Sequence, residues 1–347
     1  MPAPKPITIV GGGLAGLTLG IGLRQKGIPV TVWEAGHYPR HRVCGEFISG
    51  RGQDVLTRLG LRDYFDQAGT ALARTGAFYL GRTGSPVRSL PEAALCISRF
   101  AMDALLAGHF RQTGGELREN ARWREENYGQ GVVRANGRRL QPRADGCRWL
   151  GLKVHARNVR LEADLEMHGS QKGYVGFCRL PDGKVNVCGL FRQPASKSDG
   201  PHPWRDLLCG QAGTPLRERL AGAAFDESSF CSVAGFSLRP HRAAAQRECY
   251  IGDALTMIPP VTGNGMSMAF EAAELAIEPL TAYSRGESSW SQAQQNVAAA
   301  CDRAFARRLA WAQWLQWMMF SPLLRGWPGS MVLQSEFMWR TMFTRTR

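Results

Sequence analysis

Runs of β-branched and apolar residues alternate with glycine turns and helical stretches at the start of the chain. Residues 7–10 form a short β-branched run that predicts a strand, and a glycine turn follows it directly. The pattern over residues 17–25 is typical of a helix, and residues 29–33 predict a second strand. This order of strand, turn, helix and strand predicts the opening unit of a Rossmann-like α/β domain.

The middle of the chain carries the alternating pattern of antiparallel strands. Residues 174–190 alternate on either side of the turn Asp182-Gly183 and predict a hairpin. Residues 149–156 and 229–238 combine apolar and small side chains, which suits strands that build the wall of an apolar cavity. These patterns predict a second domain with a mostly antiparallel sheet.

The last part of the chain is rich in tryptophan and arginine. Residues 303–340 contain five tryptophans, of which Trp311, Trp314 and Trp317 would share one helix face. Such a face could rest on a membrane interface, dock a carrier protein, or simply close the second domain. Pro322 and Pro328 are expected to break the segment into helices too short to span a membrane.

Length and composition limit the classes of protein that remain. With 347 residues, 44% apolar and 21% charged, the chain suits one large or two intertwined globular domains, which excludes a disordered protein. The net charge of +14 favours anionic partners, but arginine is spread along the chain as on a solvated basic surface, and we expect no nucleic-acid partner. Nine cysteines without a C-x-x-C pair predict neither a metal site nor a disulfide framework.

The sequence also carries an expectation about location. No run of eighteen uncharged apolar residues occurs, and the first six residues lack the hydrophobic stretch of a secretion signal. We therefore expect a cytoplasmic protein, or one held peripherally at a membrane through its Trp/Arg-rich end.

Three glycines between the first predicted strand and helix satisfy the spacing G-x-G-x-x-G. The first permits a tight turn, the second lets the backbone approach a pyrophosphate, and the third lets the helix lie close to the strand. The pyrophosphate would lie on the free N–H groups of the helix start, and an acid at the end of the second strand can accept bonds from ribose hydroxyls. The motif predicts an adenine dinucleotide site that includes Gly11, Gly13, Leu14, Ala15, Gly16 and Glu34.

A second strand, glycine-rich loop and helix occur far along the chain. Residues 249–251 predict the strand and residues 267–280 the helix. An acid at the strand end suits a sugar-like hydroxyl chain, and the loop N–H groups suit an electron-rich ring edge. We expect this corner to contact the same extended ligand through Asp253, Pro260, Gly263, Asn264, Gly265 and Met266.

The two corners, with Ser98-Arg99 and Asp103 between them, resemble the FAD-dependent oxidoreductases that include aromatic hydroxylases, halogenases and geranylgeranyl reductases. The match in motif order spans residues 7–280. The resemblance implies FAD as the cofactor, with Arg99 and Arg42 as further contacts. A nicotinamide dinucleotide alone would leave the second glycine loop unexplained.

The fold expected from this resemblance is α/β, in which a Rossmann-like FAD-binding domain joins a mostly antiparallel substrate-domain sheet and C-terminal helices. The expected boundaries are residues 1–71, 93–147 and 241–285 for the FAD-binding domain, 72–92 and 148–240 for the substrate domain, and 286–347 for the C-terminal helical segment.

The segment Cys44-Gly45-Glu46 is similar to the Cys-Gly motif of the geranylgeranyl reductase branch, where the cysteine lies by the flavin and the substrate. Cys44 could tune the flavin or supply a proton if its pKa is suitable, or be a small buried hydrophobe. Glu46 could act as a general acid or base, but an ion pair with Arg40, Arg42 or Arg51 is the simpler expectation.

The expected substrate is lipophilic or aromatic, because the strands of the second domain carry few charges. Lys153 and His155 alternate along one strand and should share a face, so His155 could donate a proton or be structural. Aromatic residues line the cavity of the similar reductase hairpin. The candidates for substrate contact are Phe47, His155, Tyr174, Phe177 and Asn186.

Departures from the family patterns bear on the reaction. The Asp-Gly pair and the later histidine of aromatic hydroxylases are replaced, and the Trp-x-Trp-x-Ile-Pro signature of halogenases is absent. We expect reduction or dehydrogenation of a carbon–carbon bond in a prenyl-like or polyketide-like substrate. Flavin-dependent hydroxylation of an aromatic ring stays open, as does a flavin-bound protein whose basic tail binds a carrier protein or a membrane.

The region between the two corners is short. Residues 116–136 leave room for one or two short strands where the family inserts a meander, and nothing there resembles a nicotinamide pocket. Electrons would then come from NAD(P)H bound transiently, or from a separate reductase.

Overall fold

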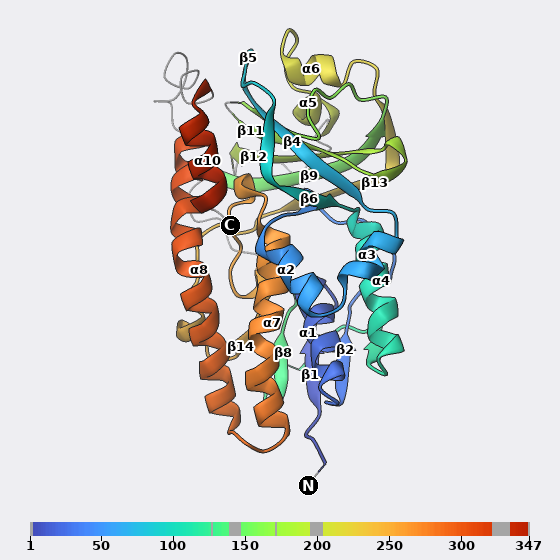
Figure 1. Cartoon of the computed structure of the whole chain (residues 1–347), viewed down its shortest axis with the longest axis vertical. Helices are drawn as coiled ribbons and strands as arrows, with labels where there is room; N and C mark the ends of the chain where they lie inside the picture. Colours follow the sequence, from blue (N-terminus) through green and yellow to red (C-terminus); the bar gives the residue numbers. More distant parts are fainter. Residues whose placement is uncertain are drawn as a thin grey trace.

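A parallel sheet forms the lower half of the molecule in Figure 1, a computed structural model that describes residues 3–125, 128–138, 147–170, 172–194, 204–320 and 334–345. Its strand order is β14–β8–β1–β2–β7, and every neighbouring pair is parallel. The strands are β1 (Ile7–Val10), β2 (Val30–Trp33), β7 (Glu116–Arg118), β8 (Val132–Arg134) and β14 (Cys249–Tyr250). The strands predicted near residues 7, 30 and 250 are confirmed, and β7 and β8 are the two short strands expected within 116–136.

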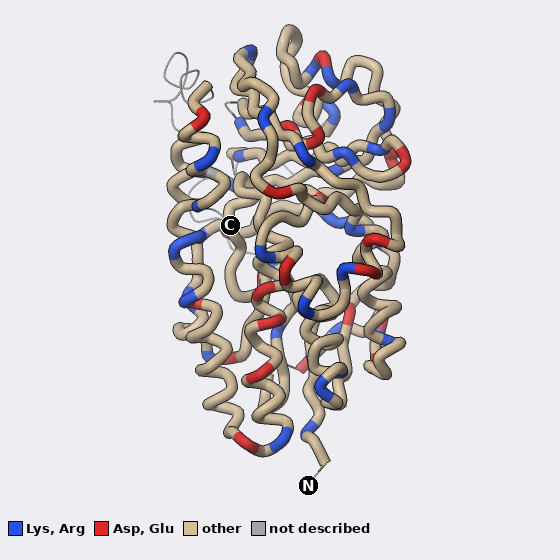
Figure 2. The backbone as a smooth tube through the Cα atoms, in the orientation of Figure 1, with Lys and Arg blue, Asp and Glu red and all other residues tan. Residues whose placement is uncertain are grey.

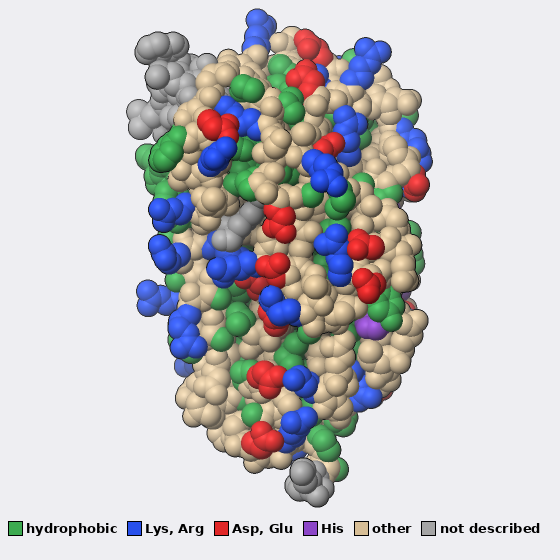
Figure 3. Space-filling model, viewed as in Figure 1, with side chains coloured by type: hydrophobic (Ala, Val, Ile, Leu, Met, Phe, Trp, Pro, Cys, Tyr) green, Lys and Arg blue, Asp and Glu red, His purple; other side chains and the backbone are tan. Residues whose placement is uncertain are grey.

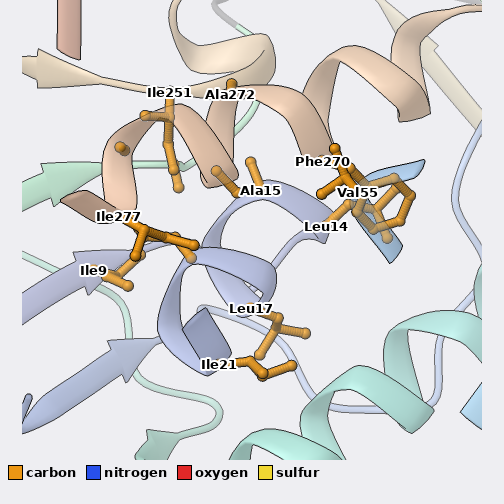
Figure 4. Close-up of a cluster of buried hydrophobic side chains, with 14 of the residues drawn as sticks. Ile9, Leu14, Ala15, Leu17, Ile21, Val55, Ile251, Phe270, Ala272 and Ile277 are labelled. Carbon is orange, nitrogen blue, oxygen red and sulfur yellow. The ribbon is translucent and has the colours of Figure 1, made fainter. Parts of the chain in front are cut away.

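Helices pack on this sheet around one apolar core, part of which Figure 4 shows. Ile9 of β1 and Leu17 of α1 are fully buried there, as is Phe270 of α7. Gly22 of α1 allows α7 to approach closely, because a Cβ at this position would lie 2.3 Å from Ile277 Cδ1. The helices of this half are α1 (Leu14–Gln25), α2 (Arg51–Arg58), α3 (Arg62–Gln67), α4 (Arg99–Gln112) and α7 (Gly265–Ser284).

A nine-stranded sheet forms the upper half (Figure 1), in the order β13–β9–β12–β11–β10–β4–β6–β3 with β5 paired to β4. Only the β10–β4 pair is parallel, so the prediction of a mostly antiparallel sheet is confirmed. The strands are β3 (Phe47–Ile48), β4 (Ala71–Leu80), β5 (Thr83–Gly84), β6 (Arg88–Cys96), β9 (Cys147–Arg157), β10 (Leu165–Gly169), β11 (Gly173–Arg179), β12 (Val185–Pro194) and β13 (Ala224–Ala234).

Short helices complete the two halves. The predicted hairpin is β11 and β12, joined by the 3-10 turn η1 (Pro181–Gly183), in which Asp182 and Gly183 both have positive φ. The remaining short helices are α5 (Trp204–Cys209), α6 (Pro215–Arg219), η2 (Ala243–Ala245), η3 (Gly252–Ala254) and η4 (Pro260–Thr262). The domain boundaries expected from the sequence stay predictions.

Two C-terminal helices run along one edge of the molecule (Figure 1), α8 (Trp290–Phe320) and α10 (Glu336–Arg345). The expectation of short helices is wrong for α8, which continues for 31 residues because its buried side packs on α7 through residues such as Val297 and Phe305. Pro322 and Pro328 lie outside the described residues. No described helix is long and apolar enough to cross a membrane.

Charge is distributed unevenly over these helices (Figure 2). The exposed side of α8 carries arginine, whereas α7 carries Glu271, Glu274 and Glu278. One buried bidentate pair, Arg308 to Glu271 at 2.6 and 2.9 Å, joins the two helices.

Replacing Phe270 by Ala should lower the free energy of unfolding by about 3–5 kcal/mol, because a fully buried ring leaves a cavity between α1 and α7. Urea unfolding followed by circular dichroism measures this change. Phe337→Ala is the matched control, since that ring is exposed, and it should change stability by less than about 0.5 kcal/mol. Equal losses in the two variants would contradict the packing described here.

Candidate flavin site

One cavity of about 850 Å³ lies between the two sheets and touches both glycine corners. Gly11, Gly13, Leu14 and Ala15 line it from the first corner. Asp253, Pro260, Gly263, Gly265 and Met266 line it from the second. The prediction that these two distant segments line one groove large enough for an extended ligand is therefore confirmed.

The first corner is a cradle with an open side. Gly11 has φ of +114°, and a Cβ there would lie 2.4 Å from the Ala135 carbonyl oxygen. A Cβ on Gly16 would lie 2.0 Å from the Gly11 carbonyl oxygen, so Gly16 lets α1 start directly against the turn. A Cβ on Gly13, by contrast, would meet nothing within 4 Å and would project toward the cavity. The free N–H groups of the α1 start face this space, which fits a pyrophosphate.

Glu34 closes the first corner at the end of β2. It is buried, and its carboxylate accepts bonds from the backbone N–H groups of Gly12 and Gly36 at 3.0 and 2.8 Å. Arg40 and Arg42 add charge-assisted contacts at 2.6 and 3.4 Å. Glu34 therefore fixes the turn as well as bordering the cavity, and its contact with a ribose stays a prediction.

Arg99 and Arg42 converge on one buried acid. Arg99 donates two hydrogen bonds to Asp103, at 2.7 and 2.8 Å, and Arg42 donates a third at 3.0 Å. Burial works against the charged form of Arg99, but the contact with Asp103 outweighs it and raises the pKa of Arg99. Both arginines border the cavity as fixed positive charges, which suits the anionic cofactor that the sequence predicts.

The second corner touches the first. A Cβ on Gly252 would lie 2.8 Å from the Ala15 Cβ, so η3 sits directly on the start of α1. Asp253 forms an ion pair with Arg138 at 3.5 Å at the cavity wall. Asn264 is buried and does not border the cavity; its carbonyl accepts a bond from Met268 at 3.0 Å at the start of α7.

Phe47 contacts the left-handed turn of the second corner. Gly263 has φ of +63°, and a Cβ there would lie 2.2 Å from the Phe47 ring. Phe47 also borders the cavity, and its contact with a substrate stays a prediction.

Glu46 is a fully enclosed charged group of the site. It is fully buried with φ of +62°, and it accepts from the Arg99 backbone N–H at 2.9 Å. His155 lies 2.7 Å and Lys153 3.3 Å from its two carboxylate oxygens. Burial alone would raise the pKa of Glu46, but the His155 hydrogen bond and the Lys153 charge outweigh it, and the pKa is lowered. The predicted ion pair with Arg40, Arg42 or Arg51 is wrong, because the cation that neutralises Glu46 comes from β9.

A chain of contacts continues from Lys153 toward the outside. Its ammonium group lies 3.0 Å from His41 Nδ1, and His41 packs on the Phe100 ring with centroids 4.6 Å apart. Burial, the Lys153 charge and the His155 charge together lower the pKa of His41 to about 4. Because His41 is neutral, its Nδ1 can accept a hydrogen bond from the Lys153 ammonium group.

Cys44 borders the cavity next to these charges. Its carbonyl accepts a bond from Asn186 at 2.9 Å, which ties the loop to β12. Burial raises the pKa of the Cys44 thiol, although Arg99 opposes the shift, so the thiol is neutral at neutral pH. Cys188 and Cys231 line the same cavity, and the register places both of them beside Lys153.

The nine-stranded sheet supplies the apolar wall of the cavity. Tyr174 is buried with Leu190, Phe236 and Met257, and its hydroxyl has no hydrogen-bond partner among the described residues. Burial raises the pKa of Tyr174 well above its usual value, so the hydroxyl stays protonated.

Strand alternation separates the predicted substrate contacts. Phe177 touches the cavity boundary, but its ring packs against His168 and an apolar cluster on the opposite face of the sheet from Tyr174. His155 and Asn186 face the cavity side, but they lie behind Glu46 and Cys44 and do not border the cavity. Lys153 and His155 share a face, as their alternation predicts.

Several cavity residues give no motif in the sequence. Trp33 and Trp123 pack edge to face with centroids 5.3 Å apart at the end beyond Glu34, where an adenine ring could lie. Trp33 directly precedes Glu34, which is a usable signal, whereas Trp123 follows a short strand with nothing to mark it. Trp339 and Phe343 of α10 close the apolar end.

Comparison with known proteins agrees with this geometry. A family model for an FAD binding domain matches residues 5–150. Rifampicin monooxygenase of Streptomyces venezuelae is 29% identical over 306 residues, covering 77% of this chain and 62% of its own length. This chain therefore spans less than two thirds of that relative.

Solved structures share the fold across nearly the whole chain. The flavin-dependent brominase Bmp2 superposes with a TM-score of 0.78 at 16% identity, covering 99% of this chain and 93% of its own. A geranylgeranyl bacteriochlorophyll reductase-like protein of Thermoplasma acidophilum has a TM-score of 0.70 at 16% identity, with coverage of 91% and 88%.

The match to an FAD binding domain over residues 5–150 and the fold shared with the brominase Bmp2 agree with a flavin site in this cavity. The backbone at Gly13 is open on the cavity side, and Trp123 Nε1 has no hydrogen-bond partner among the described residues. A bound dinucleotide could fill the first and accept a hydrogen bond from the second. The residues present therefore fit FAD.

Gly13→Val should weaken FAD binding by more than about tenfold, or 1.4 kcal/mol, because the added side chain projects into the cavity where the pyrophosphate is expected. Titration of the apoprotein by flavin fluorescence measures the affinity, and thermal unfolding checks the fold. Gly108→Val is the matched control, since a Cβ there also meets nothing within 4 Å but lies on α4, away from the cavity lining. Unchanged FAD affinity in Gly13→Val would show that the cofactor lies elsewhere.

His41→Gln should flatten the dependence of unfolding free energy on pH between about 4 and 6.5. The folded pKa lies below the unfolded one, so in this window the unfolded chain binds a proton that the folded chain does not. Stability from a neutral His41 is therefore present above pH 6.5 and is lost as the pH falls toward 4. Urea unfolding at a series of pH values measures the slope, with the exposed His37→Gln as control. Identical slopes in wild type and His41→Gln would contradict the assignment.

Proposed function

We propose that this protein is an FAD-dependent monooxygenase that hydroxylates an apolar, aromatic substrate. The observation that carries the proposal is the continuity of one cavity from the dinucleotide cradle at Gly13 to the apolar wall at Tyr174. The similarity to a rifampicin monooxygenase over 77% of this chain supports oxygenation as the reaction class. When bound, FAD would supply the electron transfer and the activation of dioxygen.

The substrate would lie between the second glycine corner and the sheet. Phe47, Tyr174, Phe236 and Met257 give an apolar and aromatic lining there. A neutral phenol such as Tyr174 can hydrogen bond to a substrate oxygen without adding charge. We infer an uncharged aromatic substrate and NAD(P)H as the electron donor. One oxygen atom of dioxygen would enter the substrate, and the other would leave as water.

The protonation states at the cavity support oxygenation over reduction of a carbon–carbon double bond. Reduction needs a general acid with a pKa near the working pH, beside the carbon that receives the proton. Cys44 is a poor donor because burial raises its pKa, and Glu46 is ionised because its pKa is lowered. Neither Cys44 nor Glu46 therefore has the pKa that this proton donation needs.

A reductase of the geranylgeranyl type is the second candidate, favoured by one observation. The Cys44-Gly45-Glu46 segment, which is similar to the Cys-Gly motif of that branch, borders the cavity. In this alternative Cys44 would contact the substrate, and the reaction would not use dioxygen.

Turnover with and without dioxygen separates the two candidates. With NADPH and a panel of aromatic compounds, we expect oxygen uptake coupled to product formation, and ¹⁸O from ¹⁸O₂ in the product by mass spectrometry. Cys44→Ser should keep the oxygenation rate within about threefold, like the control Cys231→Ser, because neither thiol has a step to perform. Anaerobic conversion of substrate, lost in Cys44→Ser alone, would overturn the monooxygenase proposal in favour of the reductase.

A further inference from the structure

The surface of α8 and α10 exposes large apolar side chains next to arginines. Trp317 is 62% exposed and Phe337 is 76% exposed, the two highest values among the large hydrophobic residues that the structure describes. Isolated exposed hydrophobic residues are ordinary, but two on neighbouring helices beside basic residues mark an interaction site.

The exposed residues of α8 form one stripe. Arg303, Arg307, Trp314 and Trp317 are all exposed, and at 100° per residue they fall within about 80° of the helix circumference. They span about 21 Å along the axis, with the arginines on the N-terminal side and the tryptophans on the C-terminal side. The opposite side of α8, including Val297 and Phe305, is buried against the protein.

α10 continues the surface beside the C-terminal end of α8. Arg345 of α10 lies over the Trp311 ring at 5.7 Å, which places the two helices in contact. Trp339 and Phe343 turn toward the cavity, whereas Phe337 and Arg340 are exposed. We name the exposed set the α8–α10 patch. It consists of Arg303, Arg307, Trp314, Trp317, Phe337 and Arg340.

The charge of the patch selects the partner. Neither Arg303 nor Arg307 is in an ion pair with another described residue, and the α8 stripe carries no acid. Arg340 on α10 is paired with Glu336 at 2.9 Å, so the unpaired positive charge of the patch lies on α8. Figure 3 shows basic side chains in a row along the edge where α8 runs in Figure 1, with hydrophobic side chains reaching the surface above them. Tryptophan prefers the headgroup level of a bilayer and arginine pairs with lipid phosphate.

We propose that the α8–α10 patch binds the surface of an anionic membrane. The contact is shallow, because arginine and tryptophan share one stripe instead of occupying opposite faces as in an inserted amphipathic helix. α10 contributes both to the patch and, through Trp339 and Phe343, to the apolar end of the cavity. An acidic carrier protein is the other partner class that basic residues could attract, and it is distinguished in the test.

Vesicle flotation of the FAD-bound full chain tests the proposal. We expect binding to phosphatidylcholine vesicles containing about one third phosphatidylglycerol, little binding to phosphatidylcholine alone, and loss of binding in 1 M salt, where charges act over only about 3 Å. Arg303→Gln with Arg307→Gln should weaken partitioning about thirtyfold, from about 1 kcal/mol for each arginine near an anionic surface. Trp314→Ser with Trp317→Ser should weaken it by about tenfold or more.

Matched controls replace exposed residues outside the patch. Tyr64→Ser and Arg51→Gln remove an aromatic ring and a positive charge from α3 and α2, and they should leave vesicle binding unchanged. Flavin fluorescence and thermal unfolding verify that each variant is folded and contains FAD.

Absence of vesicle binding at low salt, or equal losses in the controls, would overturn the proposal. Capture by an acidic acyl carrier protein without vesicle binding would overturn it in favour of that partner. No turnover is needed, so a negative result leaves the proposed oxygenation untouched.

Discussion

The site depends on the burial of one carboxylate between the two sheets. Glu46 belongs to the loop that carries Cys44, yet its partners Lys153 and His155 come from β9 of the upper sheet. A buried charge is tolerated only when its partners and hydrogen bonds replace the water it loses, and removing one partner commonly costs about 3–5 kcal/mol. The interaction therefore holds the loop of Glu46 against the upper sheet at the edge of the cavity.

The same contact orders the electrostatics around the cavity. Arg99 donates its backbone N–H to Glu46 and its side chain to Asp103, so one residue links the buried acid to the arginines at the dinucleotide end. Arg40, Arg42 and Arg99 outnumber their partners Glu34 and Asp103 by one charge, so this end of the cavity keeps a net positive charge that suits a pyrophosphate. The opposite end is left to Tyr174 and its apolar neighbours, which gives the cavity one polar and one apolar end.

The sequence is informative where function constrains the backbone locally. The first glycine corner could be predicted because Gly11 and Gly16 have no room for a Cβ. This steric constraint fixes glycine at positions close together in the sequence, where a motif is visible. The partners of Glu46 could not be predicted from the sequence, because Lys153 and His155 are more than one hundred residues away, whereas Arg40 and Arg42 are close to Glu46 in the sequence. The placement of Phe177 on the other face of the sheet from Tyr174 could have been predicted from the sequence, since residues 174 and 177 of one strand must face opposite sides.

Local sequence rules fail at two places, the candidate flavin site and the surface that we assign to a membrane. Charges lie inside at Glu46 and Lys153, beside the cavity, and large apolar rings lie outside on α8 and α10. Each departure costs stability that a purely structural role would not require, so natural proteins keep such conflicts mainly at functional sites. α10 links the two places, because Trp339 and Phe343 close the cavity while Phe337 faces solvent. One helix therefore lies between the apolar end of the cavity and the surface that we assign to a membrane.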